Sequence, residues 1–246
     1  MNTSVNIAGV TFKNPVMTAS GTFGSGAEYS EFVDLNRLGA VVTKGVANVP
    51  WPGNPTPRIA EVYGGMLNAI GLQNPGIDLF IERDIPFLKH YDTKIIVNVC
   101  GKTTEDYCEV VERLADQPID MMEINISCPN VKEGGIAFGQ DAKAAATITK
   151  AVKAVAKQPV IMKLSPNVTD IAYMAQAVKI PVLGMGGVMT AEDAIELMLA
   201  GATAVSVGTA NFANPKATEI IVDGIRQFMA EQGIDDINEL IGAVHD

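Results

Sequence analysis

Short apolar runs alternate with longer amphipathic segments along most of the chain, and this alternation constrains the fold more than any other feature. Alternating strands and helices predict βαβ units, which place parallel strands side by side in one sheet. Because the runs are apolar along most of their length, we expect helices outside a barrel or on both faces of a doubly wound sheet. The expected strands are Val16–Ser20, Ala40–Lys44, Lys94–Cys100, Met121–Ser127, Val160–Ser165, Val182–Gly186 and Ala204–Gly208.

Three intervals between these strands carry helix signals. Two of them begin at a threonine followed by acidic residues, which is a common N-terminal capping pattern: Thr103 or Thr104 in one, and Thr190 in the other. The third is rich in alanine and lysine. The expected helices are Thr104–Ala115, Asp141–Lys157 and Thr190–Ala200. Seven strands are one fewer than a (β/α)8 barrel requires. The interval between Ser165 and Val182 accounts for the difference, because it has room for a helix and turns but for no further strand.

Two other segments carry turn signals. Val5–Ile7 and Val10–Phe12 flank the dipeptide Ala8-Gly9, which predicts a small N-terminal β-hairpin. Residues Ala47–Gly76 contain five prolines and five glycines, so we expect a long loop there. Long ordered loops often carry function.

Composition excludes several classes of protein. The formal net charge of -10 and a pI near 4.7 argue against a nucleic-acid partner. The N-terminus has no secretory signal pattern, and no run of eighteen apolar residues predicts a membrane span. Three cysteines without CxxC spacing (Cys100, Cys108 and Cys128) favour a reducing cytoplasm over a disulfide framework or a zinc site, so no metal site is expected. His90 and His245 are expected at the solvated surface.

Polar side chains interrupt or close four of the apolar strands. They are Lys44, Asn98, Asn125 and Lys163. Taken singly, each has an ordinary explanation, such as a satisfied hydrogen bond or a lysine that reaches solvent. Taken together, they favour a site at the carboxyl ends of the strands, where barrel enzymes hold their active sites. Two cations in an acidic protein indicate an anionic ligand.

Glycines follow the last two predicted strands. Gly184-Met-Gly-Gly187 is a weak signal alone, but Gly208-Thr209 repeats it one βα unit later. Barrels commonly bind phosphate after their last two strands, where glycine lets backbone amides approach the ligand. The phosphate of a flavin mononucleotide, with a lysine near its ring, would satisfy both features.

The run from Glu123 to Asn130 is the most unusual strand. Glu123, Asn125 and Ser127 share one face of it, where buried polar groups are costly without partners. Cys128 follows the strand end. Buried cysteines are commonly inert, but nearby lysines would lower the pKa of this thiol and suit it to proton abstraction.

These residues resemble the dihydroorotate dehydrogenase family, and specifically the catalytic subunit of its bacterial NAD-linked form. The resemblance runs nearly end to end. Three segments favour this form over the single-subunit fumarate-linked one: Thr43-Lys-Gly45, Asn130-Val-Lys-Glu-Gly-Gly135 and Gly208-Thr-Ala-Asn-Phe212. The motifs that carry it are Asn125-Ile-Ser-Cys-Pro-Asn130, Asn14-Pro-Val-Met-Thr-Ala-Ser-Gly21, Gly53-Asn-Pro-Thr-Pro-Arg58, Asn68-Ala-Ile-Gly-Leu-Gln-Asn74, Lys163-Leu-Ser-Pro-Asn167 and Gly184-Met-Gly-Gly187.

The resemblance implies a single-domain (β/α)8 TIM barrel over residues 1–246 that holds FMN and oxidises dihydroorotate to orotate in pyrimidine biosynthesis. It implies that Cys128 is the catalytic base. The flavin contacts that it implies are Ser20, Lys44, Gly45, Asn98, Asn125, Lys163, Gly186, Gly187, Gly208 and Thr209. The substrate contacts that it implies are Lys44, Asn68, Ala69, Ile70, Gly71, Leu72 and Asn125.

The resemblance also implies a cytoplasmic protein with a partner. A second subunit with FAD and a [2Fe–2S] cluster would pass electrons to NAD, and a homodimer of the catalytic subunit would form the core of the assembly. The chain has neither a cysteine cluster for iron–sulfur ligation nor a GxGxxG motif, consistent with a partner performing that step. Two alternatives stay open: a non-catalytic scaffold barrel, and a flavin reductase for another pyrimidine.

The chain departs from the family pattern near residues 173–179. The sixth strand, its Asn-Thr pair for the substrate, and the Gly-rich loop that follows are missing there. Either the printed sequence omits an internal stretch of the intact protein, or the protein carries a true deletion. The Cα–Cα spacing across Tyr173–Lys179 distinguishes the two, because a continuous trans chain keeps about 3.8 Å at every step.

Overall fold

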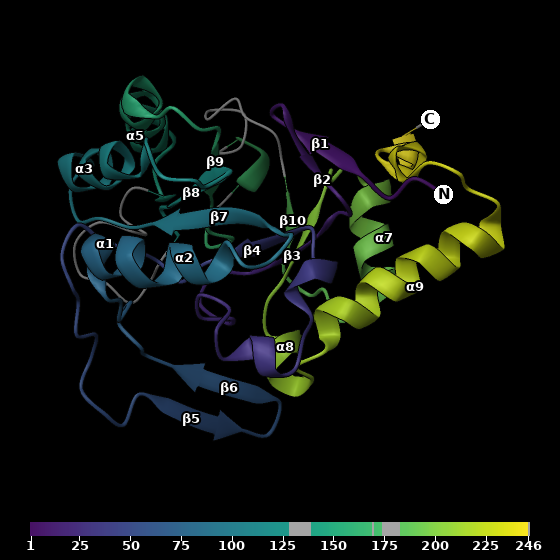
Figure 1. Ribbon diagram of the computed structural model, residues 1–246, viewed down its shortest axis with the longest axis horizontal. Helices are drawn as coiled ribbons and strands as arrows, with labels where there is room; N and C mark the ends of the chain where they lie inside the picture. Colours follow the sequence, from purple (N-terminus) through teal and green to yellow (C-terminus); the bar gives the residue numbers. More distant parts are fainter. Residues whose placement is uncertain (128–138, 169, 174–182, 246) are drawn as a thin grey trace.

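Seven parallel strands form the main sheet of the computed structural model, which describes residues 1–127, 139–168, 170–173 and 183–245 (Figure 1). The sheet curls as an incomplete (β/α)8 barrel, which confirms the predicted fold class. Its strands lie in the order β10 (Gly184–Met185), β11 (Val205–Val207), β3 (Val16–Thr18), β4 (Ala40–Val42), β7 (Lys94–Val99), β8 (Met121–Asn125) and β9 (Val160–Lys163), and each pair is parallel.

The two edges of this sheet are strands that follow one another in the chain. Among the described residues, β9 and β10 each pair with one strand of the main sheet. A closed barrel would join them through one further strand. The sequence predicted that a strand is missing from this same interval, between β9 and β10. The Cα spacing test across Tyr173–Lys179 falls on residues 174–179, which lie outside the described residues.

All seven strands are shorter at their carboxyl ends than the sequence predicted. Val42 ends β4, although the prediction extended it to Lys44. The reason is that the backbone leaves the sheet: the Lys44 N–H donates to the carbonyl of Gly24, in a loop, at 2.8 Å. Several predicted site residues therefore lie just beyond the strands, on loops.

Four long helices cover the outside of the sheet: α3 (Thr104–Leu114), α5 (Ala142–Val155), α7 (Ala191–Leu199) and α9 (Ala217–Gln232). One apolar cluster lies beneath α3 and α5 and includes the fully buried Tyr107. A second lies beneath α7 and α9 and includes Met198 and Ile221. Within the described ranges, no helix is long and apolar enough to cross a membrane.

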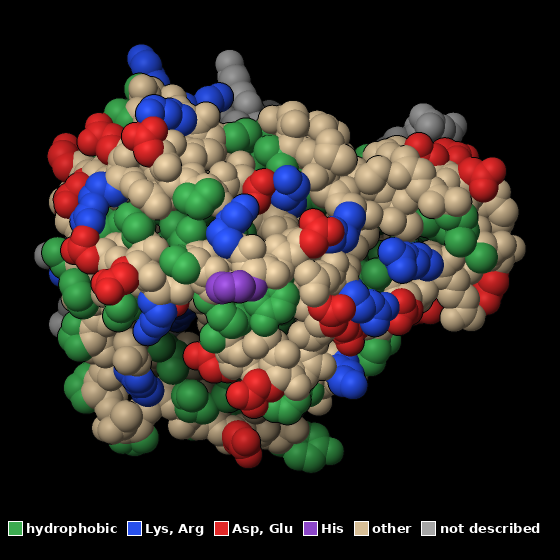
Figure 2. Space-filling view, in the orientation of Figure 1, with side chains coloured by type: hydrophobic (Ala, Val, Ile, Leu, Met, Phe, Trp, Pro, Cys, Tyr) green, Lys and Arg blue, Asp and Glu red, His purple; other side chains and the backbone are tan. Residues whose placement is uncertain are grey.

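Short helical elements lie in the connections. They are η1 (Tyr29–Glu31), η2 (Leu35–Arg37), α1 (Gly76–Leu79), η3 (Phe80–Asp84), α2 (Ile85–Leu88), α8 (Ala210–Ala213), η4 (Ile237–Leu240) and η5 (Ala243–His245). His90 is exposed, as predicted. Acidic and basic side chains are interspersed over the face in Figure 2.

The predicted N-terminal hairpin is confirmed, with β1 (Val5–Ile7) paired to β2 (Val10–Phe12). The segment predicted as one long loop, however, contains a second antiparallel hairpin, β5 (Ile59–Val62) and β6 (Gly65–Asn68). The glycines and prolines of this segment are typical of loops, so its two short strands were not predicted. All eight residues of these two strands are exposed. This hairpin stands apart from the main sheet, at the lower edge of Figure 1.

The capping boxes of α3 and α7 form as the sequence predicted. In α7, the Thr190 hydroxyl accepts a hydrogen bond from Asp193 N, and the Asp193 side chain accepts from the N–H groups of Met189 and Thr190. These bonds lower the pKa of Asp193 below its ordinary 3.8. Its stabilising contribution is therefore present above pH 3.8 and is lost as the pH falls through the lowered value.

Replacing Thr190 with Ala is expected to lower the free energy of unfolding by about 1 kcal/mol, because one backbone N–H at the start of α7 loses its acceptor. Urea unfolding of both proteins measures the change. Thr190→Ser keeps the hydroxyl and is the matched control. A loss as large in Thr190→Ser as in Thr190→Ala would contradict the capping explanation.

Candidate active site

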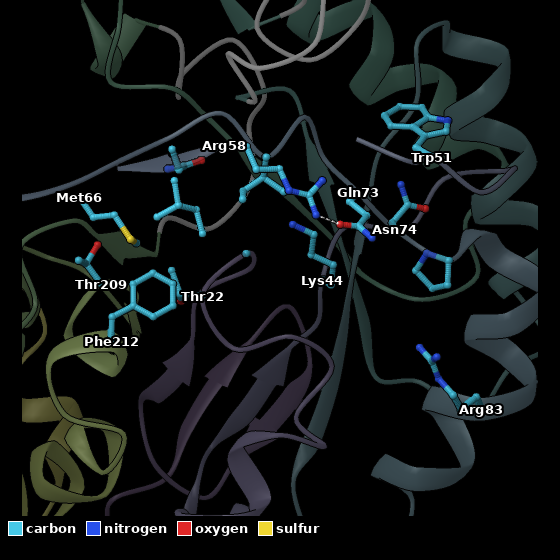
Figure 3. A pocket seen from close by; sticks show the side chains of 15 residues that line it. Thr22, Lys44, Trp51, Arg58, Met66, Gln73, Asn74, Arg83, Thr209 and Phe212 are labelled. Carbon is cyan, nitrogen blue, oxygen red and sulfur yellow. Dashed lines mark hydrogen bonds between the residues drawn. The ribbon is translucent and has the colours of Figure 1, made fainter. Parts of the chain in front are cut away.

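Two adjoining cavities open at the carboxyl ends of the strands. The first, of about 650 Å³, lies between these ends and the β5–β6 hairpin (Figure 3). The second, of about 440 Å³, lies over β9, β10 and β11. Thr22 and Thr209 line both, so the two spaces adjoin at these residues.

Cations dominate the charge of the first cavity. Lys44, Arg58 and Arg83 line it, and none of its described lining residues is Asp or Glu, although the chain carries a net charge of -10. Arg83 is paired with Asp84 at 2.6 Å, whereas Arg58 donates to the neutral side chain of Gln73. Lys44 and Arg58 point toward the middle of the cavity (Figure 3). This arrangement favours a small anionic ligand.

The second cavity has the features of a phosphate site. Gly186 and Gly187 have φ angles of 103° and 77°, which favour glycine, and a Cβ on either would meet no atom within 4 Å. Their backbone therefore borders open space. Lys163 lines the same cavity, and its side chain forms no hydrogen bond or ion pair with another described residue. A half-buried cation beside an open glycine turn fits the phosphate and ring of a flavin nucleotide.

A chain of hydrogen bonds links the polar side chains of β7 and β8. The Asn98 Nδ2 donates to Glu123 Oε1, and the Asn125 Nδ2 donates to Asn98 Oδ1 at 3.2 Å. The Asn125 Oδ1 accepts from both the backbone N and the Oγ of Ser127, at 3.1 and 3.0 Å. Tyr107, from α3, donates its hydroxyl to the Asn125 carbonyl at 2.7 Å. The buried polar row that the sequence predicted is therefore satisfied.

The predicted site residues fall into three groups. Ser20, Lys163, Gly186, Gly187, Gly208 and Thr209 line the second cavity. Lys44, Asn68 and Ile70 line the first. Gly45, Asn98 and Asn125 are buried together, where a Cβ on Gly45 would lie 2.9 Å from Asn98 Oδ1.

The remaining predicted residues do not line either cavity or lie outside the described residues. Ala69, Gly71 and Leu72 belong to the same loop as Ile70 but are not among the lining residues. Leu72 has a φ of 56°, an unusual value for a branched side chain, and such backbone strain clusters at functional sites. Cys128 lies outside the described residues, directly after Ser127.

Sequence reasoning missed several residues of the site. Trp51, Gln73 and Phe212 come from loops and from α8, where an isolated polar or aromatic residue carries no periodic signal. Asn211 is fully buried, and its Nδ2 donates to the carbonyls of Val207 and Gly208 at 2.9 and 3.1 Å. It thereby holds the turn that presents Gly208 to the second cavity. Within the described ranges, no group of three His, Cys, Asp or Glu side chains is arranged to hold a metal ion.

A curled parallel sheet with two cavities at its carboxyl ends is the arrangement of a (β/α) barrel enzyme. The family model for dihydroorotate dehydrogenase matches residues 2–180 and 171–229. The chain belongs to the dihydroorotate dehydrogenase family.

Two bacterial relatives are similar over nearly the whole chain. The dihydroorotate dehydrogenase B (NAD(+)) catalytic subunit of Lachnoclostridium phytofermentans is 57% identical, over 99% of this chain and 100% of the relative. The subunit of the same name from Geobacter sulfurreducens is 48% identical, over 98% of this chain and 97% of the relative. Among solved structures, DHODH of Eimeria tenella in complex with ferulenol has a TM-score of 0.83 at 21% identity, over 99% of this chain and 89% of that one. This last likeness supports the barrel fold.

The alignments are longer than the chain. The alignment with the Lachnoclostridium subunit spans 299 positions, whereas this chain has 246 residues, so at least 53 positions of the relative face no residue here. The two stretches that match the family model overlap at residues 171–180.

Proposed function

We propose that this chain is the FMN-containing catalytic subunit of an NAD-linked dihydroorotate dehydrogenase, which oxidises dihydroorotate to orotate in pyrimidine biosynthesis. The observation that carries the proposal is that the two cavities adjoin at Thr22 and Thr209. A glycine turn with the half-buried Lys163 adjoins a cationic space lined by Lys44 and Arg58. A flavin nucleotide and a carboxylated pyrimidine require such neighbouring sites. The names and the 48–57% identity of the bacterial relatives support the same activity.

The residues divide the work of the reaction. Lys163 and the glycine turn at Gly186 and Gly187 would hold FMN, which would supply the acceptor for the hydride from C6 of dihydroorotate. Cys128 removes the proton from C5, and Lys44 offsets the charge of the substrate carboxylate. The Asn98 and Asn125 amides hold the flavin, Asn125 also holds the pyrimidine ring, and the loop Asn68–Leu72 contacts the substrate.

Electrons then leave through a second subunit, for which we propose FAD and a [2Fe–2S] cluster. The words "catalytic subunit" in the relatives' names support such a partner. We further propose a homodimer of this chain as the core of the assembly. A cytoplasmic location fits three cysteines that have no disulfide or metal-binding spacing.

Anaerobic addition of dihydroorotate to the purified, flavin-loaded protein tests the proposed activity. We expect a flavin absorbance spectrum that bleaches as orotate forms. A flavin that does not bleach would favour a reductase for another pyrimidine. A protein that takes up no flavin under saturating FMN would favour a non-catalytic scaffold.

Replacing Lys163 with Ala is expected to raise the dissociation constant for FMN by about 10- to 100-fold, because a charge-assisted hydrogen bond contributes about 1.5–3 kcal/mol. Fluorescence titration of the apoprotein with FMN measures it. Lys150→Ala, which removes an exposed lysine of α5, is the matched control and should bind FMN as the unmodified chain does. Equal affinities in the two variants would remove Lys163 from the flavin site.

A further inference from the structure

Glu123 is a buried carboxylate for which the proposed reaction has no use. Its side chain lies on β8, it is 4% exposed, and it lines neither cavity. The parallel register places it directly opposite Asn98 of β7, and its Oε1 accepts a hydrogen bond from Asn98 Nδ2. Burying a carboxylate is costly, so its place beside the amides that we propose to hold the ligands calls for a reason.

The reason lies in the direction of the hydrogen bonds. A carboxylate accepts hydrogen bonds, whereas an asparagine amide can be turned to donate or to accept on either side. Because Glu123 accepts, the NH₂ group of Asn98 faces it, and Asn98 Oδ1 faces Asn125. The Asn125 Nδ2 then donates to Asn98, and Asn125 Oδ1 faces Ser127. One acceptor at the end of the row thus sets the orientation of two amides.

The surroundings leave these amides little other freedom. A Cβ on Gly45 would lie only 2.9 Å from Asn98 Oδ1, so the backbone closes that side of the amide. The Tyr107 hydroxyl holds the backbone carbonyl of Asn125 from behind. Asn98 is fully buried and Asn125 is 5% exposed. The movement that remains for each side-chain amide is a rotation by half a turn, which exchanges the positions of its NH₂ donor and its oxygen acceptor.

We propose that Glu123 is a positioning residue, which fixes the amide orientations of Asn98 and Asn125 and thereby the donor and acceptor pattern that the flavin and the pyrimidine meet. The inference rests on the proposed function, in which Asn98 contacts the flavin and Asn125 contacts both ligands. Glu123 itself touches neither ligand and acts through Asn98.

Glu123→Gln tests this role in the flavin-loaded protein. The variant keeps the shape and a hydrogen-bonding partner, but its amide can donate or accept, so both orientations of Asn98 become available. We expect the dissociation constants for FMN and orotate to rise by about tenfold, as for the loss of a hydrogen bond or two. The change in the flavin spectrum on orotate binding should differ from that of the unmodified protein.

Asp120→Asn is the matched control. Asp120 precedes β8 at the opposite end of the same strands, where it accepts from Lys94 Nζ and Ile95 N, each at 2.9 Å. Its replacement disturbs the same pair of strands far from the amides, so both dissociation constants should stay unchanged. The double variant Asn98→Ala, Glu123→Gln should bind orotate as Asn98→Ala does, because Glu123 acts through Asn98.

Unchanged FMN and orotate affinities in Glu123→Gln, or additive effects in the double variant, would overturn the inference. If Glu123→Gln does not fold, hydrogen exchange in the unmodified protein tests the role instead. The Nδ2 protons of Asn98, assigned by their loss in Asn98→Ser, should be protected from exchange with and without orotate. Rapid exchange of these protons would overturn the positioning role of Glu123. Failure of dihydroorotate to reduce the flavin in the unmodified protein would instead reject the proposed function, and the FMN affinity of Glu123→Gln would still decide the role of Glu123.

Discussion

Replacing Cys128 with Ala is expected to slow the reduction of bound flavin by dihydroorotate by about 10²- to 10⁴-fold, which is the usual contribution of a general base. The variant should still bind FMN, because the proposed flavin contacts come from other residues, among them Lys163 and the glycine turn at Gly186. Anaerobic stopped-flow spectroscopy of the flavin-loaded variant measures the reduction rate separately from binding.

Cys108→Ala is the matched control for this variant. Cys108 is half-buried on α3, and its burial, with the nearby carboxylates of Glu112 and Glu105, raises the pKa of its thiol. A thiol with a raised pKa is a poor source of thiolate, so its loss should leave the reduction rate unchanged. A Cys128→Ala variant that reduces its flavin as fast as Cys108→Ala would exclude Cys128 as the base.

Inserting a strand and a loop between β9 and β10 is expected to raise the catalytic efficiency for dihydroorotate strongly. We propose that the chain lacks a segment of the family pattern near residues 173–179. Two observations support this: at least 53 positions of the Lachnoclostridium subunit have no counterpart here, and the two edges of the described sheet are consecutive strands. By family resemblance, that segment carries an Asn-Thr pair for the substrate and a loop for the flavin.

Inserting the corresponding segment of the Lachnoclostridium subunit should therefore raise kcat/KM for dihydroorotate by at least about 10²-fold, because an incomplete site misplaces its reactants. Steady-state assays with an artificial electron acceptor measure the gain. A Gly/Ser insert of the same length is the control and should give no gain. Equal turnover by the 246-residue chain and the version with the inserted segment would show that the missing strand is dispensable.

The parts of the fold that depend on local sequence were predictable. Threonines at 103 and 190 cap their helices as expected, because a cap needs only the residues within one turn. The β5–β6 hairpin was missed, since the prolines and glycines around it are typical of loops. Strand ends were extended too far, because the point where a backbone leaves a sheet depends on distant partners such as Gly24 for Lys44.

The residues of the candidate site also divide into those that the sequence predicted and those that it did not. Lys44 and Lys163 line the cavities and could be found from sequence, because polar residues interrupt or end apolar strands and parallel topology brings those ends together. Asn98 and Asn125 stay predicted ligand contacts, since they line neither cavity. The residues that the sequence did not predict lie on loops and short helices whose positions follow from tertiary packing, such as Arg58 beneath the hairpin and Phe212 on α8. The bond between Asn98 and Glu123 required the register of β7 and β8.

The two threonines shared by the cavities limit how this protein can be redesigned. A bulkier residue at Thr22 or Thr209 would shrink the proposed flavin space and the proposed substrate space together. Gln73, Met66 and Phe212 line the first cavity alone. Libraries that vary these three positions should alter the choice of pyrimidine while the protein keeps its flavin, which gives a route to new specificity that spares the cofactor.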